Sequence, residues 1–389
     1  MLKSQELRKV APEVDPLRIG MGWKVKDLEK PQIMIESTYG DSHPGSAHLL
    51  DFVKEIERGI NENGGKGAKY FTTDICDGQA QGHDGMNYSL ASREFIADMI
   101  EIQAGATPFD AGVFVASCDK GMPANLMAAA RLNIPSIVFT GGIMAAGPNM
   151  LTLEQLGTYS ARFERGEITK EEFCYAKENA CPSCGACSFM GTASTMQVMA
   201  EALGLALPGT ALLPAISPDL MTKAYEVGVR ALELAKEGIR PSDILTEKAF
   251  ENAIMVHAAI AGSSNSLLHI PAIAHEIGIE LDAEKFDKIH REIPYILNIR
   301  PSGFYPGEYF YYAGGVPAIM EEIKEFLHLD VMTVTGKTLG ENLEELKKTA
   351  KIMPMVNQVE VHPQSSKNEM LNYCIENNIQ LIAWSPIMN

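Results

Sequence analysis

A strand–helix–strand pattern between residues 111 and 140 constrains the fold of this chain most. Residues 111–117 form an apolar run typical of a buried strand, residues 123–132 are rich in Ala, Leu and Met and fit a helix, and residues 134–140 again resemble a strand. Two strands joined through a helix lie parallel in one sheet. Ligands of such sheets bind beyond the carboxyl ends of the strands, so the pattern also predicts where chemistry takes place.

Strands and helices alternate in this way through roughly the first 215 residues. Residues 69–75 fit a further strand, and helical periodicity dominates from 218 to 329, for example over 223–237 and 248–261. We therefore predict an α/β fold, with a doubly wound, mostly parallel sheet and flanking helices.

The composition is that of an ordinary globular protein, with 389 residues of which 46% are hydrophobic and 21% charged. A formal net charge of −17 argues against nucleic acid or an anionic membrane as a partner, since both require a basic patch. The first residues show no signal peptide, and the apolar stretch 134–147 is broken by Pro135 and the Gly141–Gly142 pair. Together with an odd number of cysteines, seven, these features predict a cytoplasmic protein.

One cysteine directly follows the strand predicted at 111–117, in the sequence Cys118-Asp119-Lys120. Asp77 follows the strand predicted at 69–75 in the same way. A thiolate at such a turn suits a soft metal or an iron–sulfur cluster. The neighbouring carboxylate suggests a second, harder cation.

Three further cysteines stand close together as Cys181, Cys184 and Cys187, before a helix predicted at 190–203 whose free amide groups suit anions. Spacing alone leaves an iron–sulfur site, a zinc half-site and buried thiols open. A bacterial ferredoxin run is excluded, because Gly191 occupies the position of its fourth cysteine. A zinc ribbon would need a second pair, and Cys374 is alone, so a cluster bound by distant cysteines fits best.

Seven motifs together resemble the dihydroxy-acid and sugar-acid dehydratases, in order from about residue 30 to 346. They are the segments 82–90, 118–135, 181–187, 201–208, 267–270, 313–318 and 333–339. The resemblance implies a hydro-lyase that dehydrates a 2,3-dihydroxy acid, such as 2,3-dihydroxy-isovalerate or a sugar acid, to a 2-keto acid. It also implies an iron–sulfur cluster, [2Fe–2S] or [4Fe–4S], acting as a Lewis acid, a Mg²⁺ ion that holds the substrate, and a homodimer.

Individual residues match the functional positions of this family. Cys118 and Cys187 match its cluster cysteines, and Asp77 and Asp119 match its magnesium carboxylates. Lys120 matches the catalytic lysine that becomes carbamylated and so turns into an oxygen ligand of the metal. The plain structural alternative is that the two aspartates cap turns and that Lys120 pairs with one of them.

The sequence departs from the family at a third cluster cysteine. Gly45 stands in its place, within Pro44-Gly45-Ser46-Ala47-His48. Some members lack that cysteine and are thought to bind a four-iron cluster, so we expect another cysteine, Cys184, to serve as the third ligand. His48 is either a hydrogen-bond donor near the cluster or a structural residue. A second departure, in residues 190–196, resembles the sugar-acid branch and leaves the choice of substrate open.

The third departure is the tail. After Leu346 nothing resembles the family's carboxy-terminal domain, which supplies a magnesium-binding glutamate and the serine thought to act as the base. Residues 349–389 resemble instead a strand–helix–strand fragment of the aldo-keto reductase barrel, with a helix at 366–377. Gln358 and Trp384 match nicotinamide contacts of that family or are ordinary strand residues. We predict two domains, 1–346 and 349–389, and the alternative function is an inactive remnant that binds only metal or a partner.

Overall fold

The computed structural model describes the backbone of residues 2–349, 356–360 and 380–384, and the side chains of residues 2–346. It divides into two compact units, Met1–Asn342 and Leu343–Asn389. The strands are β1 (Gln32–Ser37), β2 (Lys66–Phe71), β3 (Ala111–Ala116), β4 (Ser136–Thr140), β5 (Val356–Glu360) and β6 (Gln380–Trp384). The α-helices are α1 (Lys3–Val10), α2 (Val14–Gly20), α3 (Leu49–Glu62), α4 (Asp77–Ala80), α5 (Ser89–Ala106), α6 (Gly121–Leu132), α7 (Leu156–Glu164), α8 (Lys170–Asn179), α9 (Thr192–Ala202), α10 (Pro218–Glu237), α11 (Pro241–Ile244), α12 (Glu247–Ala259), α13 (Ser266–His275), α14 (Ala283–Glu292), α15 (Glu308–Tyr312), α16 (Gly315–Glu322) and α17 (Leu339–Thr349). The 3-10 helices are η1 (Val25–Asp27), η2 (Asp84–Tyr88), η3 (Pro148–Met150) and η4 (Leu153–Gln155).

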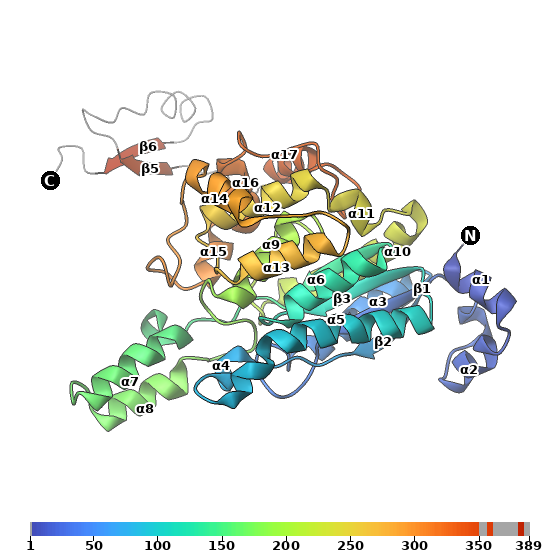
Figure 1. Cartoon of the computed structure of the whole chain (residues 1–389), viewed down its shortest axis with the longest axis horizontal. Helices are drawn as coiled ribbons and strands as arrows, with labels where there is room; N and C mark the ends of the chain where they lie inside the picture. Colours follow the sequence, from blue (N-terminus) through green and yellow to red (C-terminus); the bar gives the residue numbers. More distant parts are fainter. Residues whose placement is uncertain (1, 350–355, 361–379, 385–389) are drawn as a thin grey trace. The chain divides into compact units, whose positions relative to one another are not determined.

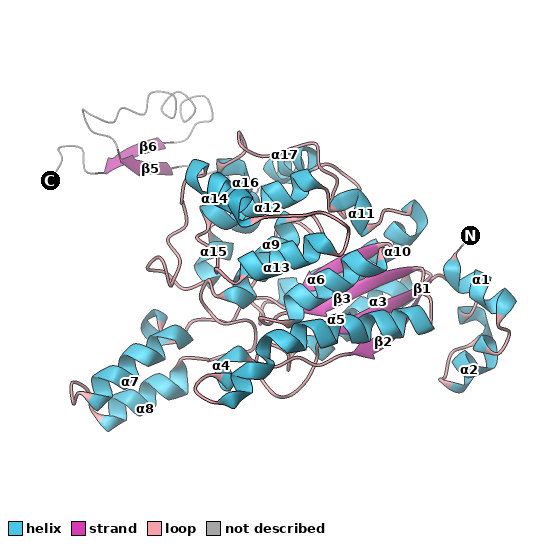
Figure 2. Cartoon of the chain, viewed as in Figure 1, coloured by secondary structure: helices cyan, strands magenta, loops and turns pink. Residues whose placement is uncertain are grey.

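A four-stranded, all-parallel sheet forms the centre of the first unit, in the order β2-β1-β3-β4 (Figure 2). Ile33 of β1 pairs with Gly67 of β2 and Ala111 of β3, and Gly112 of β3 pairs with Ser136 of β4. The chain moves from β1 outward to β2 and then crosses to the other side for β3 and β4. Such a reversal of direction is the topological switch point of a doubly wound sheet. The predicted fold class is confirmed.

Helices cover both faces of this sheet (Figure 1). The helices α3 and α10 pack together on one face, and α5 and α6 pack together on the other. Because both faces are covered, β1 is buried along its whole length, and its sequence, QIMIES, has a continuous apolar centre rather than an alternation. The helix α3 has a buried apolar stripe with helical spacing, which consists of Leu49, Phe52, Val53, Ile56 and Ile60.

Two glycines allow α3 and α10 to approach each other closely. A Cβ atom at Gly59 would lie 2.3 Å from the carbonyl oxygen of Tyr225, and one at Gly228 would lie 2.3 Å from that of Ile56. Real Cβ atoms do not come so close to a backbone oxygen, so any larger residue would push the two helices apart.

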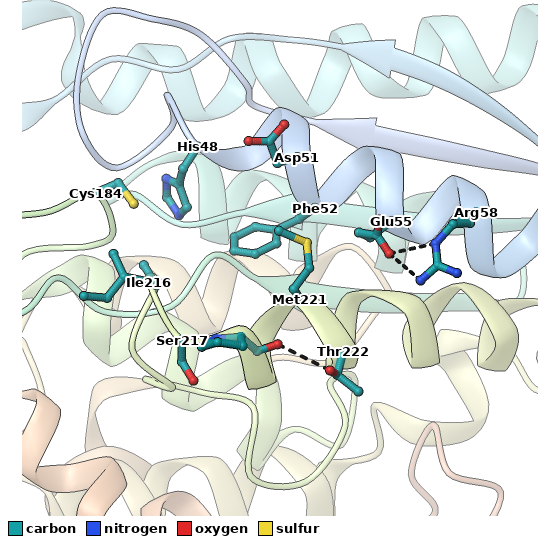
Figure 3. Close-up of a pocket in the computed structure, with 12 residues that line it drawn as sticks. His48, Asp51, Phe52, Glu55, Arg58, Cys184, Ile216, Ser217, Met221 and Thr222 are labelled. Carbon is teal, nitrogen blue, oxygen red and sulfur yellow. Dashed lines mark hydrogen bonds and ion pairs between the residues drawn. The ribbon is translucent and has the colours of Figure 1, made fainter.

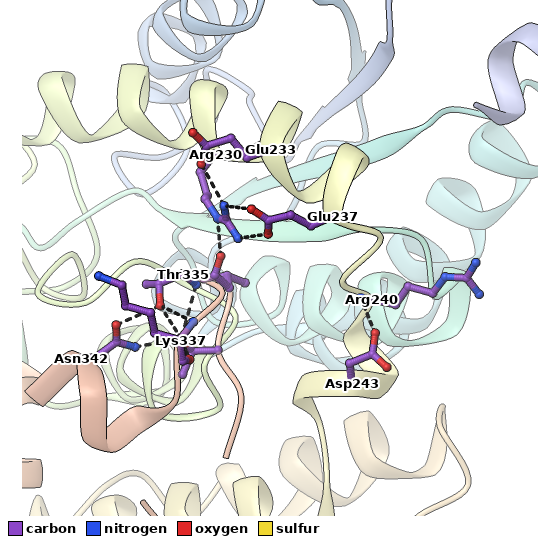
Figure 4. Close-up of polar contacts among 10 residues, drawn as sticks. Arg230, Glu233, Glu237, Arg240, Asp243, Thr335, Lys337 and Asn342 are labelled. Atoms are coloured by element: carbon purple, nitrogen blue, oxygen red, sulfur yellow. Dashed lines mark hydrogen bonds and ion pairs between the residues drawn. The ribbon is translucent and has the colours of Figure 1, made fainter. Parts of the chain in front are cut away.

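Several later helices of the first unit form a second layer over α6, in which α9 and α13 contact α6 and α12 contacts α9, α14 and α16. The segment before α17 is tied to α10. The Nε atom of Arg230 donates to the carbonyl oxygen of Val334 at 2.6 Å, and the same guanidinium pairs with Glu233 and Glu237 (Figure 4). The Nδ2 atom of Asn342 donates to Thr333 Oγ1 at 2.8 Å, so this segment is held through polar contacts.

The helices α7 and α8 form a hairpin that extends away from the sheet (Figure 1). Its small apolar cluster consists of Leu151, Ala176 and Ala180, with Leu156 and Tyr159 packed against it. No helix within the described part of the chain has the length and apolarity needed to span a bilayer.

The structure differs from the sequence-based prediction at β2, which spans 66–71 rather than 69–75. The strand begins directly after the turn at Gly64, where φ is positive, and residues 72–75 belong to a loop in which Asp74 bonds to side chains of the loop that follows β1. In the second unit, β5 and β6 pair in parallel. The helix predicted at 366–377 and the side chains of Gln358, Cys374 and Trp384 lie outside the described residues.

Candidate metal centre

Three loops gather at the carboxyl ends of β1, β2 and β3, at the switch point of the sheet. The loop after β1 carries His43 and Gly45, the loop after β2 carries Asp74 and Cys76, and the loop after β3 carries the segment 117–120. Because the strands are parallel, these loops meet at one edge. The edge is also where sequence reasoning placed Cys118, Asp119 and Lys120.

Asp77 and Lys120 form an ion pair at this edge. The Nζ atom of Lys120 donates to Asp77 Oδ2 at 2.6 Å, and Ser89 Oγ donates to Asp77 Oδ1 at 2.7 Å. Lys120 is buried and Asp77 is half-buried. The pairing is the one expected of an unmodified lysine.

Asp119 lies against the amino-terminus of α9, where the amide of Ala193 donates a hydrogen bond to its carboxylate. Burial, followed by the negative charge of Asp77, raises the pKa of Asp119 to about 6. Two neighbouring carboxylates are a suitable pair for a divalent cation, which neutralises both.

A cavity of about 570 Å³ connects the two carboxylates with one of the predicted cluster cysteines. Asp77, Asp119 and Cys187 all line it, together with Thr192, Ser194 and other residues around the start of α9. Burial, followed by the charge of Asp119, holds the pKa of the Cys187 thiol well above its usual range. The thiol therefore stays protonated unless a metal replaces its proton.

The other predicted cluster cysteine, Cys118, is buried, does not line this cavity and forms a hydrogen bond with Cys76. That hydrogen bond lowers the pKa of Cys76 to about 6. One ligand atom each from His43, Cys76 and Cys118 lies within 4.8 Å of the others. Among the residues whose side chains are described, this is the one group of three or more His, Cys, Asp or Glu side chains with metal-site spacing.

A carboxylate fixes the orientation of His43. Its Nε2 atom lies 2.8 Å from Asp74 Oδ1, and Ser46 Oγ donates to the same oxygen. The opposite ring nitrogen, Nδ1, is buried and has no hydrogen-bond partner in the described part of the chain. Metal-binding histidines are commonly held by a carboxylate in this way, so the donor set fits a soft metal or an iron–sulfur group.

Cys184, expected as the third cluster ligand, lines a different cavity. Figure 3 shows it beside His48 and Ile216, in a pocket of about 640 Å³ between the starts of α3 and α10. The Nε2 atom of His48 lies 2.7 Å from the carbonyl oxygen of Gly141, so His48 has a structural partner. Cys184 is not among the residues that line the cavity of Asp77, Asp119 and Cys187.

Sequence reasoning missed three residues of this centre: His43, Asp74 and Cys76. Cys76 had a visible signal, because it directly precedes Asp77 as Cys118 precedes Asp119. His43 and Asp74 are 31 residues apart and meet only because β1 and β2 are paired. The strand β1 was itself not predicted, so the pairing had no basis in the sequence pattern.

Comparison with known proteins assigns the chain to a family. Residues 30–342 match the amino-terminal model of the dihydroxy-acid/6-phosphogluconate dehydratases. The chain belongs to this family, as its motifs predicted. Residues 329–389 also match the aldo/keto reductase family, which agrees with the resemblance found in the tail.

Individual relatives show the same assignment. The chain is 43% identical over 336 residues to the dihydroxy-acid dehydratase of Caldicellulosiruptor saccharolyticus, which covers 84% of this chain and 60% of that protein. Over 336 residues it is also 43% identical to the dihydroxy-acid dehydratase of Caldanaerobacter subterraneus subsp. tengcongensis, covering 85% and 60%. The dihydroxy-acid dehydratase of Halothermothrix orenii is 42% identical over 335 residues, covering 85% and 61%. The chain thus spans about 60% of the length of these curated relatives.

Proposed function

We propose that this chain carries the cluster-binding and magnesium-binding part of a hydro-lyase that converts a 2,3-dihydroxy acid to a 2-keto acid. The observation that carries the proposal is a single cavity that has Asp77, Asp119 and Cys187 in its wall. Carboxylates and thiols are ligands for different metals, hard and soft, and their presence in one cavity suits a reaction that uses both.

The two kinds of metal would have separate tasks. When bound, an iron–sulfur cluster supplies a Lewis acid to the departing hydroxyl group, and Mg²⁺ holds the substrate's carboxylate and neighbouring hydroxyl group. Cys118 and Cys187 would hold the cluster, and Asp77 and Asp119 would hold Mg²⁺. The chain's own contribution is to place both donor sets at the edge of one rigid sheet.

Lys120 has two possible states at this site, with opposite consequences for Asp77. As an ammonium it cannot bind a cation, and it competes for Asp77 through the ion pair at 2.6 Å. As a carbamate it would bring a negative charge beside Asp77 and Asp119, which only a cation between them could stabilise. We infer that carbamylation of Lys120 and Mg²⁺ binding occur together.

Residues at the start of α9 suit the substrate. The polar residues Thr192, Ser194 and Asn265 line the cavity, and the amide groups of the helix amino-terminus favour an anion. Hydroxyl groups of a dihydroxy or sugar acid would replace water at these polar groups, and its carboxylate would lie near the helix end and Mg²⁺. The cavity wall therefore supports a small anionic hydroxy acid, with the sugar acids and dihydroxy-isovalerate as candidates.

The test is formation of a 2-keto acid by the full chain. The protein is purified without oxygen, supplied with iron, sulfide and Mg²⁺, and incubated with 2,3-dihydroxy-isovalerate and a panel of sugar acids. We expect a keto acid from at least one substrate, and none after removal of Mg²⁺ or after Asp119→Asn. If the loaded protein yields keto acid no faster than a blank of metal ions and sulfide, the alternative function stands, a chain that binds metal without turnover.

A further inference from the structure

We propose that Cys76 is the third cysteine ligand of the iron–sulfur group. The inference rests on the proposed function, because it assumes that Cys118 and Cys187 hold such a group. It differs from the expectation based on the family, in which the third cysteine stands at the position of Gly45 or, failing that, is replaced by Cys184.

Gly45 lies against both His43 and Cys118. A Cβ atom there would lie 3.1 Å from His43 Nδ1 and 3.2 Å from Cys118 Sγ. The backbone at this position therefore lies close to the cluster cysteine, and a side chain would require His43 or Cys118 to shift by a few tenths of an ångström. Since Gly45 offers no ligand atom, a third thiolate has to come from another residue that borders the same space.

Cys76 borders that space. Its sulfur, the Cys118 sulfur and a ring nitrogen of His43 all lie within 4.8 Å of one another. Two ligands bonded to one metal at about 2.3 Å are at most about 4.6 Å apart, and ligands to different irons of one cluster lie further apart. The separation is therefore small enough for Cys76 and Cys118 to share one cluster.

The chain repeats the same dipeptide at the two strands that flank β1. Cys76-Asp77 follows β2, and Cys118-Asp119 follows β3. In both dipeptides the aspartate lines the cavity assigned to Mg²⁺. The two cysteines are hydrogen-bonded to each other. If Cys118 is a cluster ligand, Cys76 therefore lies next to the same cluster.

His43 gives independent support for a bound group here. It is 3% exposed, and its Nδ1 atom has no partner within the described residues although Nε2 is held by Asp74. A buried polar atom without a partner is destabilising, and a group bound between His43 and the two thiols would offset this cost. Cys184, in contrast, lines the separate pocket beside His48.

The test compares two half-buried cysteines in the full chain. The wild type and the variants Cys76→Ser and Cys184→Ser are loaded with iron and sulfide without oxygen. Iron and acid-labile sulfide per chain are then measured, and an electron paramagnetic resonance spectrum is recorded after reduction. We expect Cys76→Ser to lose at least about ten-fold in cluster content, since even the partners of metal ligands contribute ten-fold or more to affinity. Cys184→Ser should retain the cluster. Far-ultraviolet circular dichroism checks that both variants fold.

A second measurement needs no variant. Wild type with and without its cluster is treated with iodoacetamide, and modification is located by mass spectrometry. Cys76 should be protected only when the cluster is present, whereas Cys184 should react equally in both forms. A cluster that leaves Cys76 reactive, or that survives Cys76→Ser unchanged, would overturn this inference alone. Failure of the wild type to take up iron and sulfide would overturn the proposed function as well.

Discussion

At the scale of single residues, the centre depends on groups that are buried before any metal is bound. Lys120, His43 and Cys118 are all buried, and Cys187 is partly buried with a raised thiol pKa. Such groups are costly to bury unless they are paired, and their pairing fixes which of them can accept a metal. Asp77 is paired with Lys120, whereas Asp119 receives only the amide of Ala193 among the contacts described.

Asp119 should therefore control the response to Mg²⁺. We expect Mg²⁺ to raise the melting temperature of the wild type, by the equivalent of about 2.7 kcal/mol at a concentration 100 times its Kd. Asp119→Asn should abolish the rise. Asp287→Asn, at an exposed carboxylate on α14 that pairs with Arg291, is the control and should retain it. If Mg²⁺ raised the melting temperature equally in both variants, Asp119 would not be a magnesium ligand.

Glu36, on β1, should give the stability of the protein a distinct pH dependence. Its burial raises its pKa from 4.5 to about 8, and Thr72 Oγ1 donates to it at 2.8 Å. Below pH 4.5 the carboxyl group is protonated in both the folded and the unfolded chain, so it does not change the free energy of unfolding. Between pH 4.5 and 8 only the unfolded chain loses this proton, so the free energy of unfolding falls as the pH rises.

The variant Glu36→Gln should remove this effect. The free energy of unfolding of the variant minus that of the wild type should rise between pH 4.5 and 8, by the order of a few kcal/mol, and stay level below pH 4.5. Urea unfolding at several pH values measures it. A difference that does not change with pH would show that Glu36 ionises as it does in the unfolded chain.

At the scale of secondary structure, the sequence predicted elements whose pattern is local. The strands at 111–117 and 134–140 and the helix between them correspond to β3, β4 and α6, and the helices α9, α10 and α12 were also anticipated. It did not predict β1, because a short buried strand has no alternation to distinguish it from other apolar segments. The same contrast between local patterns and strand pairing holds for the site. Cys118 and Asp119 were found from their place after a strand, but the contacts of Cys76 and His43 depend on strand pairing.

Packing between α3 and α10 gives a test at this scale. Gly228→Ala should destabilise the protein by about 1–3 kcal/mol, because the new Cβ would overlap the carbonyl oxygen of Ile56. Gly105→Ala, in α5, is the matched control. No atom lies within 4 Å of its added Cβ, so the better helix propensity of Ala should stabilise by up to about 1 kcal/mol. Thermal unfolding that ranks the two variants in the opposite order would contradict the close helix packing.

At the scale of the whole molecule, the residues assigned to the centre all lie in the unit Met1–Asn342, and the tail forms part of the other unit. A chain ending at residue 346 should therefore bind iron and sulfide to the same content as the full chain and melt at the same temperature. Metal analysis and calorimetry of the two chains check this. A large loss of cluster in the shortened chain would show that residues of the tail complete the centre.

The central proposal is that Cys118 and Cys187 hold one iron–sulfur group, and cluster content measures this directly. We would reconstitute the wild type and three variants without oxygen and compare their iron content, acid-labile sulfide and visible absorption. The variants are Cys118→Ser, Cys187→Ser and the control Cys174→Ser, whose changed residue lies on α8. We predict a cluster in the wild type and in Cys174→Ser, and its loss in both other variants. A cluster that persists in Cys118→Ser or Cys187→Ser, or a wild type that takes up neither iron nor sulfide, would contradict this proposal.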